Sequence, residues 1–144
     1  ANTRNDEMVQ NLDFAPTLLE AANIPIPEDM QGESLLPLLK GDTIDWTRDA
    51  VYYHYYEYPA VHQVKRHYGI VTKEFKLAYF YYDVDEWELY DRRKDPDEMK
   101  NVYQDPAYVA VVAALKKKLA DLRIQYQDSE ELDQHYIELT GGKE

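Results

Sequence analysis

The side chains of this sequence that could bind an anion gather in one stretch, HYYEYPAVHQVKRHYG at residues 54–69. The stretch holds three of the four histidines of the chain, four tyrosines and the adjacent pair Lys65-Arg66, although the chain as a whole is acidic. An arginine can grip a sulfate or carboxylate through two parallel hydrogen bonds, and a histidine can donate one at neutral pH. Tyrosine rings supply flat faces for a sugar ring. We therefore predict that this stretch recognises an anionic sugar.

We expect five residues of this stretch to contact the substrate, namely Tyr58, His62, Lys65, Arg66 and His67. Pro59 stiffens the chain where it leaves the preceding strand, so the loop that follows has a fixed origin. A second interpretation stays open, in which His67 and Tyr68 simply belong to a strand and the two cations are surface residues. Composition alone does not decide between the two interpretations.

A dedicated metal site is not expected among these residues. Four of them are able to bind a metal, but their spacing matches neither the H-E-x-x-H pattern nor a zinc ribbon: His54, Glu57, His62 and His67. In a strand, His54 and Glu57 would point to opposite faces because side chains alternate. The chain has no cysteine, so thiolate ligands and disulfides are excluded.

We predict no catalytic residue in this chain. It contains only two serines, of which Ser34 is better placed to cap a helix and Ser129 lies in a polar tail. The sequence has no G-x-S-x-G pattern and no glycine-rich phosphate loop. The carboxylates of YDVDEWELYD at residues 82–91 sit around a predicted turn, where acidic side chains are usually solvated.

Charge and hydropathy narrow the classes of partner. The net charge of −12 and a pI near 4.7 argue against general nucleic-acid binding, which needs a basic face. No apolar run approaches the roughly 20 residues of a membrane-spanning helix, and no signal peptide is visible. With 144 residues, of which 44% are hydrophobic, the chain is long enough to fold around a core.

The elements that must position the anion-binding stretch follow from local patterns. Residues 13–22 and 34–41 predict short helices with a proline in the first turn, capped by Asp13 and Ser34. Runs rich in β-branched and aromatic residues predict four strands, at 50–57, 67–72, 75–82 and 87–91. The tight TKEF connection predicts a hairpin between the second and third strands, and we expect all four to form an antiparallel meander.

An antiparallel sheet needs a cover on one face. Residues 105–126 predict a long helix, with Asp105 as its cap, Pro106 at its first position and apolar residues every three or four positions from Val109. Lys117 is spaced to pair with Asp121 on the solvent side. We therefore predict an α+β fold, with a small sheet of about four strands covered by a long C-terminal helix and preceded by short helices. The expected parts are a helical segment at 1–48, an α+β subdomain at 49–127 and an acidic tail at 128–144.

Two parts of the chain resemble a known family. The segment VQNLDFAPTLLEAANIPIPEDMQGESLLPLLKG resembles the helical segment that follows the catalytic core in formylglycine-dependent sulfatases of the alkaline-phosphatase-like superfamily. The stretch from His54 to Tyr103 resembles their C-terminal subdomain, most distinctively in the run ELYD…DP-E--N from Glu88 to Asn101. The resemblance covers residues 8–126 and is closest to bacterial sulfatases of glycosaminoglycans and mucin glycans, including N-acetylglucosamine-6-sulfatases. One departure is Val71, where relatives more often carry arginine.

The resemblance implies hydrolysis of a sulfate ester, but with the reactive groups elsewhere. The family uses a formylglycine, made from the Cys or Ser of C/S-x-P-S-R, and a calcium held by Asp and Asn, and these belong to a larger N-terminal domain. Because this sequence has no such motif, the resemblance assigns no nucleophile, metal ligand or cofactor to it. The implied partners are that N-terminal catalytic domain and a sulfated saccharide, and the implied location is periplasmic or secreted.

We expect this chain to be the C-terminal part of a sulfatase, inactive alone, that lends side chains to the sugar pocket. The apolar surface of helices 13–22 and 35–39 exceeds what one small sheet and one helix can cover, which fits a missing partner domain. One alternative is a non-catalytic module that binds a glycan or a protein. Another alternative keeps the superfamily and changes the ester, as in a phosphatase-like relative.

Overall fold

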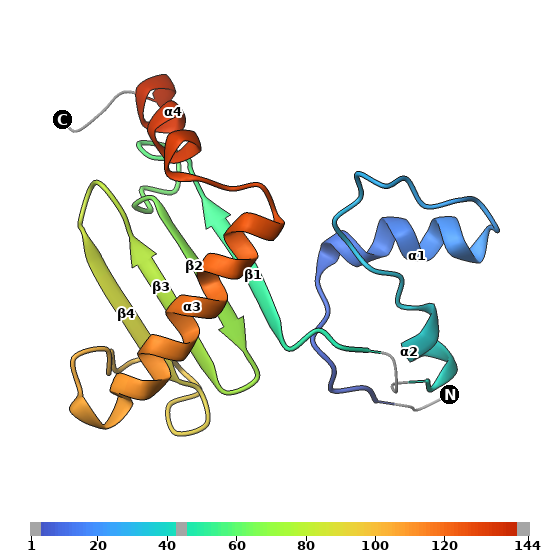
Figure 1. The fold of residues 1–144 in the computed structure, drawn as a ribbon, viewed down its shortest axis with the longest axis horizontal. Helices are drawn as coiled ribbons and strands as arrows, with labels where there is room; N and C mark the ends of the chain where they lie inside the picture. Colours follow the sequence, from blue (N-terminus) through green and yellow to red (C-terminus); the bar gives the residue numbers. More distant parts are fainter. Residues whose placement is uncertain (1–3, 43–45, 141–144) are drawn as a thin grey trace. The chain divides into compact units, whose positions relative to one another are not determined.

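The computed structural model describes residues 4–42 and 46–140. The chain divides into two compact units between Val51 and Tyr52, and each is described on its own. The first unit contains the 3-10 helix η1 (Asn11–Asp13) and the helices α1 (Phe14–Ala21) and α2 (Leu36–Lys40). The second unit contains the sheet and the helices α3 (Val109–Gln125) and α4 (Glu130–Thr140), which are labelled in Figure 1.

The first unit is organised around a buried ion pair. Asp13 precedes α1, but its side chain does not cap that helix. Its carboxylate instead accepts hydrogen bonds from Arg48 at 2.5 and 2.8 Å and from the amides of Gln10 and Glu33 at 2.8 and 3.0 Å. Burial by itself would raise the pKa of Asp13, but the hydrogen bonds from Arg48, Glu33 and Gln10 outweigh it and keep the pKa below its usual value. The prediction that Asp13 caps α1 was therefore wrong, because its side chain binds the nearby Gln10 amide and two distant residues, Glu33 and Arg48.

The second predicted helix forms largely as expected. The Ser34 hydroxyl accepts a hydrogen bond from the Leu36 amide at 3.2 Å, and a proline lies in the first turn. Gly41 ends α2 with φ +86°, a backbone conformation that glycine adopts without strain. Helix α2 keeps only one of its leucines buried, since Leu38 is 8% exposed and Leu39 is 73% exposed. The first unit therefore keeps apolar side chains at its surface.

The predicted four-stranded meander is confirmed. The strands are β1 (Ala50–Tyr55), β2 (His67–Thr72), β3 (Phe75–Phe80) and β4 (Glu86–Asp91), in the order β1-β2-β3-β4. Strands β2 and β3 pair antiparallel with Tyr68 opposite Tyr79, and the Thr72 hydroxyl accepts the Phe75 amide in the tight connection between them. This order places the loop that joins β1 to β2 at the end of two neighbouring strands.

Helix α3 lies across one face of the sheet, as Figure 1 shows. Three fully buried side chains of this face, Ile70, Leu77 and Leu89, form the core with Leu115 and Leu119 of α3. The predicted start of the helix is a separate 3-10 turn, η2 (Pro106–Tyr108), in which Asp105 accepts the Ala107 amide as expected. Because α3 begins after this turn, Val109 is 65% exposed instead of lying in the predicted apolar stripe. The predicted pair of Lys117 with Asp121 is present at 2.8 Å.

The acidic C-terminal segment forms a helix. Helix α4 buries Asp133 and Ile137, so it is held by contacts of its own. Among the described residues, no helix combines the length and apolar character that a membrane span requires.

Candidate functional site

The loop between β1 and β2, residues 58–66, brings three of the five predicted site residues together. Lys65 Nζ bonds the Tyr58 hydroxyl and lies 3.7 Å from the centroid of the Tyr58 ring. Arg66 bonds the Tyr58 carbonyl through Nη2 and lies 5.6 Å from the same ring. The peptide bond between Tyr58 and Pro59 is cis. Loop 58–66 is thus a closed structure in which one aromatic ring lies beside two cations.

The two cations of the pair Lys65-Arg66 differ in exposure. The Arg66 guanidinium is fully buried and forms an ion pair with Asp83 Oδ2 at 2.9 Å, in the turn between β3 and β4. Its Nη2 also bonds Thr140 Oγ1 at 2.5 Å. Lys65 is only partly buried. Of the two, Lys65 is the cation that can meet a ligand without first leaving a buried ion pair.

His62 lies at the tip of loop 58–66 and is exposed. Its neighbour Val61 is 93% exposed. Among the described residues, His62 has no hydrogen-bond or aromatic-ring partner.

His67 is the first residue of β2 and lies in a stack of aromatic rings. Its ring centroid is 5.7 Å from that of Tyr55 and 4.8 Å from that of Phe80. Its Nδ1 is 2.8 Å from the carbonyl oxygen of Lys65. His67 and Phe80 alternate with the core residues of their strands, so they lie on the sheet face opposite α3. Its place in a strand agrees with the second interpretation of the sequence.

A buried polar cluster that the sequence did not predict lies on the α3 face of the sheet. His54 Nδ1 is 2.8 Å from Asp128 Oδ2, and its Nε2 is 2.9 Å from the Tyr81 hydroxyl and 3.6 Å from Asp133 Oδ1. Arg123 bonds Asp133 at 2.8 Å and lies 3.4 Å from Asp128. Tyr52 also donates to Asp128. The sequence signal was His54 itself, since a histidine at a core-facing strand position needs buried partners.

Charge and burial act in opposite directions within this cluster. Burial would raise the pKa of Asp128, but the hydrogen bonds from His54 and Tyr52 outweigh it and lower that pKa. At Asp133 burial wins, and its pKa is raised despite the hydrogen bond from Arg123. Burial, followed by the bond to Asp128, also raises the pKa of Tyr52, which keeps this hydroxyl protonated as a donor.

Three side chains of this cluster, one imidazole and two carboxylates, have a spacing that resembles a metal site. One ligand atom each from His54, Asp128 and Asp133 lies within 4.8 Å of the others. The Arg123 guanidinium lies beside both carboxylates and neutralises their charge. A metal ion at this place would have to displace that guanidinium. The cluster therefore has the composition of a buried ion-pair network that joins β1 to the α3–α4 segment.

The two serines of the described residues lie outside the motif from which the family's formylglycine is made. Ser34 is held at the start of α2, and Ser129 is followed by two glutamates, so neither lies in an S-x-P-S-R context. The chain has no cysteine from which a formylglycine could form. A formylglycine and the calcium that accompanies it do not fit the residues of this chain, and no bond-breaking step is assigned to them. Loop 58–66 can bind and orient an anionic group.

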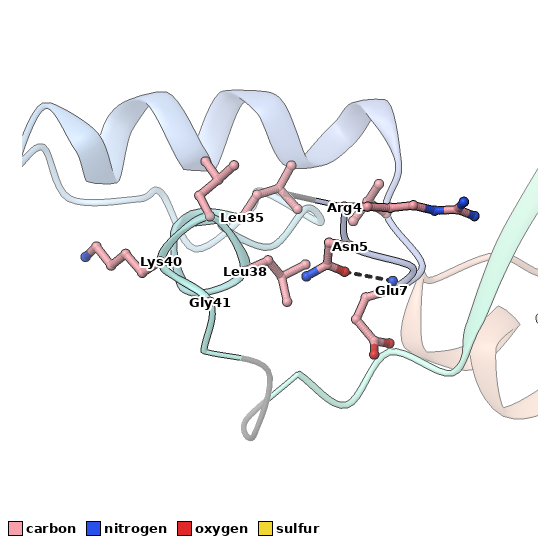
Figure 2. A pocket seen from close by; sticks show the side chains of 9 residues that line it. Arg4, Asn5, Glu7, Leu35, Leu38, Lys40 and Gly41 are labelled. Carbon is pink, nitrogen blue, oxygen red and sulfur yellow. Dashed lines mark hydrogen bonds between the residues drawn. The ribbon is translucent and has the colours of Figure 1, made fainter. Parts of the chain in front are cut away.

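The first unit has a pocket of about 550 Å³ between the segment 4–9 and α2. Figure 2 shows Leu35 and Leu38 on one side and the Arg4–Glu7 segment on the other, with the Asn5 side chain accepting a hydrogen bond from the Glu7 amide. Val9 and Leu39 add apolar surface. Apolar and charged side chains together line this pocket.

Comparison with known proteins identifies the chain. The family model described as N-sulphoglucosamine sulphohydrolase, C-terminal, matches residues 1–125. The chain is 43% identical over 146 residues to an N-acetylglucosamine-6-O-sulfatase of Bacteroides thetaiotaomicron. The aligned region covers 99% of this chain and 26% of that protein. A solved structure described as a complex with its substrate D-glucosamine-2-N,6-O-disulfate matches with a TM-score of 0.78 and 50% identity, over 82% of this chain and 24% of the other.

A phosphonate monoester hydrolase of Agrobacterium radiobacter also matches, with a TM-score of 0.65 and 28% identity over 79% of this chain and 24% of the other. The chain thus spans about a quarter of the length of the relatives it matches. The resemblance predicted from residues 8–126 is confirmed by the family model and by these alignments. This chain belongs to the sulfatase family of N-sulphoglucosamine sulphohydrolase and corresponds to its C-terminal region.

Proposed function

We propose that this chain is the C-terminal part of a sulfatase that hydrolyses a sulfate ester of a glycosaminoglycan or mucin-type sugar. The observation that carries the proposal is the 43% identity to an N-acetylglucosamine-6-O-sulfatase along 99% of this chain. Its role is to position the sugar, because binding and orientation are the chemistry that its residues can supply. The nucleophile and the calcium belong to the remainder of the enzyme, and the chain alone is inactive.

Within this role, loop 58–66 and the adjacent His67 form one wall of the sugar pocket. His62 and Lys65 approach the sulfated sugar directly, since both are at least partly exposed. The Tyr58 ring supports Lys65 and offers a flat apolar surface to the sugar. The substrate we propose is a sulfated glucosamine derivative, the class named for the relatives above.

The proposed partner of the first unit is the catalytic domain of the same sulfatase. Its exposed apolar side chains, which include Phe14, Leu18 and Leu39, are 62%, 69% and 73% exposed. Together with the pocket beside α2, they form a surface of the kind that marks an interface. We place the whole enzyme in the periplasm or outside the cell, in keeping with its sulfated glycan substrate.

The test begins with the gene. An upstream reading frame with C/S-x-P-S-R supports the sulfatase, whereas a start codon near residue 1 supports a free-standing module that binds a glycan or a protein. The full-length protein is then assayed for sulfate release from 6-O-sulfated N-acetylglucosamine, beside the 144-residue chain alone. Turnover by the chain alone would contradict the proposal.

The second candidate function is hydrolysis of a phosphate or phosphonate ester. The similarity to a phosphonate monoester hydrolase favours it, because the two enzymes share this region of the fold. Assaying the full-length protein on matched 4-nitrophenyl sulfate and phenylphosphonate esters separates the two. A higher kcat/KM for the phosphonate would favour this candidate over the sulfatase.

A further inference from the structure

Arg66 joins three separate segments of the second unit. Its guanidinium bonds the Tyr58 carbonyl at the start of loop 58–66, Asp83 Oδ2 in the β3–β4 turn at 2.9 Å, and Thr140 Oγ1 at the end of α4 at 2.5 Å. Arg66 is 0% exposed, and the Asp83 side chain is 3% exposed. A buried guanidinium is costly to leave without its anion, so this geometry is strongly preferred over one in which Arg66 turns outward.

The bond to Tyr58 closes loop 58–66 at its base, because Arg66 is the last residue of the loop and Tyr58 the first. Between residues 60 and 64 the described hydrogen bonds are local, with the Gln63 amide and side chain both donating to the Ala60 carbonyl. The tip therefore makes few contacts of its own, and its position relative to the sheet depends on the base.

We propose that Arg66 is a positioning residue, which holds the base of loop 58–66 so that His62 and Lys65 meet the anionic sugar. The proposal rests on the proposed function and divides the pair Lys65-Arg66 between two roles. Within residues 4–42 and 46–140, the Lys65 ammonium contacts the hydroxyl and ring of Tyr58 and is partly exposed, so it can reach an anion. Arg66 would first have to break its ion pair with Asp83. Asp83 and Thr140 then influence sugar binding without touching the sugar.

The test uses the full-length protein and a double-mutant cycle. Asp83→Asn keeps the shape of the side chain and removes its charge, and His62→Ala removes the group at the tip. We expect Asp83→Asn to raise KM for 6-O-sulfated N-acetylglucosamine about tenfold, with kcat/KM for 4-nitrophenyl sulfate, which has no sugar, changed less than about twofold. In the His62→Ala background, Asp83→Asn should raise KM by less than the roughly tenfold rise expected in the wild type, because the loss of one positioned group makes the two changes non-additive.

A second variant and a control variant distinguish the proposed effect from a simple loss of folding. Thr140→Val removes one partner of Arg66 at the exposed end of α4, and we expect the same direction with a smaller rise in KM. Glu138 lies on the same helix and accepts a hydrogen bond from Gln134 at 3.0 Å, and Glu138→Ala should leave the kinetics with both substrates unchanged. Equal losses on the sugar and the aryl sulfate, or additive effects of Asp83→Asn and His62→Ala, would overturn the positioning role.

The 144-residue chain gives a readout that does not need an active enzyme. Asp83→Asn should increase hydrogen exchange of the Gln63 amide, which bonds the Ala60 carbonyl, at least about tenfold, while the amides of β3 keep their protection. Unchanged exchange in the loop would overturn the inference even if the parent were a sulfatase. Conversely, an enzyme that releases no sulfate from any sugar would refute the proposed function, and loop exchange would still decide whether Arg66 anchors the loop.

Discussion

The imidazole of His54 and the carboxylate of Asp128 are 2.8 Å apart, although 74 residues separate them in the sequence. Both side chains are 4% exposed, so this contact is part of the interior of the second unit. It connects β1 with the segment between α3 and α4, while Arg123 and Asp133 complete the network from the two helices. The position of α4 thus depends on paired charges as much as on apolar burial.

Removing one member of this network should destabilise the chain strongly. Asp128→Ala removes the buried acceptor of Tyr52 and His54 Nδ1 and one of the two carboxylates beside Arg123, and we expect a loss of about 3–5 kcal/mol in the free energy of unfolding. Urea unfolding followed by circular dichroism measures it. Asp121→Ala, which breaks an exposed pair on α3, is the control and should cost less than about 1 kcal/mol. Similar losses for the two variants would mean that the cluster does not hold the fold together.

Acid should destabilise the first unit through Asp13. Its folded-state pKa lies below the ordinary value of 3.8, so in acid the unfolded chain binds this proton more readily than the folded chain. The stabilisation is therefore fully present above pH 3.8 and is lost as pH falls through the folded-state pKa.

Thermal unfolding of the 144-residue chain between pH 6 and pH 2 tests this effect. We expect Asp13→Asn to be less stable than the wild type at pH 6 and to approach it at the acid end. A constant difference in Tm across this range would argue against a lowered pKa at Asp13.

Two leucines of α2 allow the stability of the chain and the docking of its surface to be tested separately. Leu38 is 8% exposed, so Leu38→Ala should cost about 2–5 kcal/mol in the 144-residue chain. Leu39 is 73% exposed, and Leu39→Ala should change the stability of that chain by less than about 0.5 kcal/mol. In the full-length protein, however, Leu39→Ala should lower Tm if this surface packs on the catalytic domain. An unchanged Tm there would remove Leu39 from the proposed interface.

Lys65 should matter for the sugar substrate of the full-length enzyme. A hydrogen bond to a charged group contributes about 1.5–3 kcal/mol, so Lys65→Ala should lower kcat/KM roughly 10- to 150-fold. Lys117→Ala removes an exposed lysine of α3 and serves as the control for net charge. If both variants keep the wild-type kinetics, Lys65 does not belong to the sugar site.

The strands and helices were predictable because their signals are local. The bounds of β2 agree with the predicted 67–72, and the other strands differ by one or two residues at their ends. The capping predictions divide for a physical reason. Asp105 caps a nearby amide as predicted. Ser34 accepts the Leu36 amide, but Leu35 and not Ser34 is the N-cap residue of α2. Asp13 meets Arg48 across 35 residues and is drawn into the interior. A local pattern cannot reveal such a distant partner.

The candidate site was predictable in composition but not in geometry. The sequence places Lys65 and Arg66 side by side. Arg66 is buried and Lys65 is partly exposed because Asp83 and Thr140, which are remote along the chain, bind Arg66. The sequence predicts only an acidic tail at 128–144 and not its packing, because the residues that neutralise Asp128 and Asp133 lie in β1 and α3. Buried ion pairs between distant segments are the part of this fold that residue patterns do not encode.

Helix α4 also has a practical consequence for anyone who trims this protein. The family model ends at residue 125, ahead of Asp128, Asp133 and Thr140. A protein truncated at residue 125 would lack both carboxylates that pair with Arg123. The Arg123 cation would then be left unpaired inside the remaining protein. We expect such a product to precipitate, whereas one that extends through Thr140 stays in solution. The family match and the folded unit therefore end at different residues.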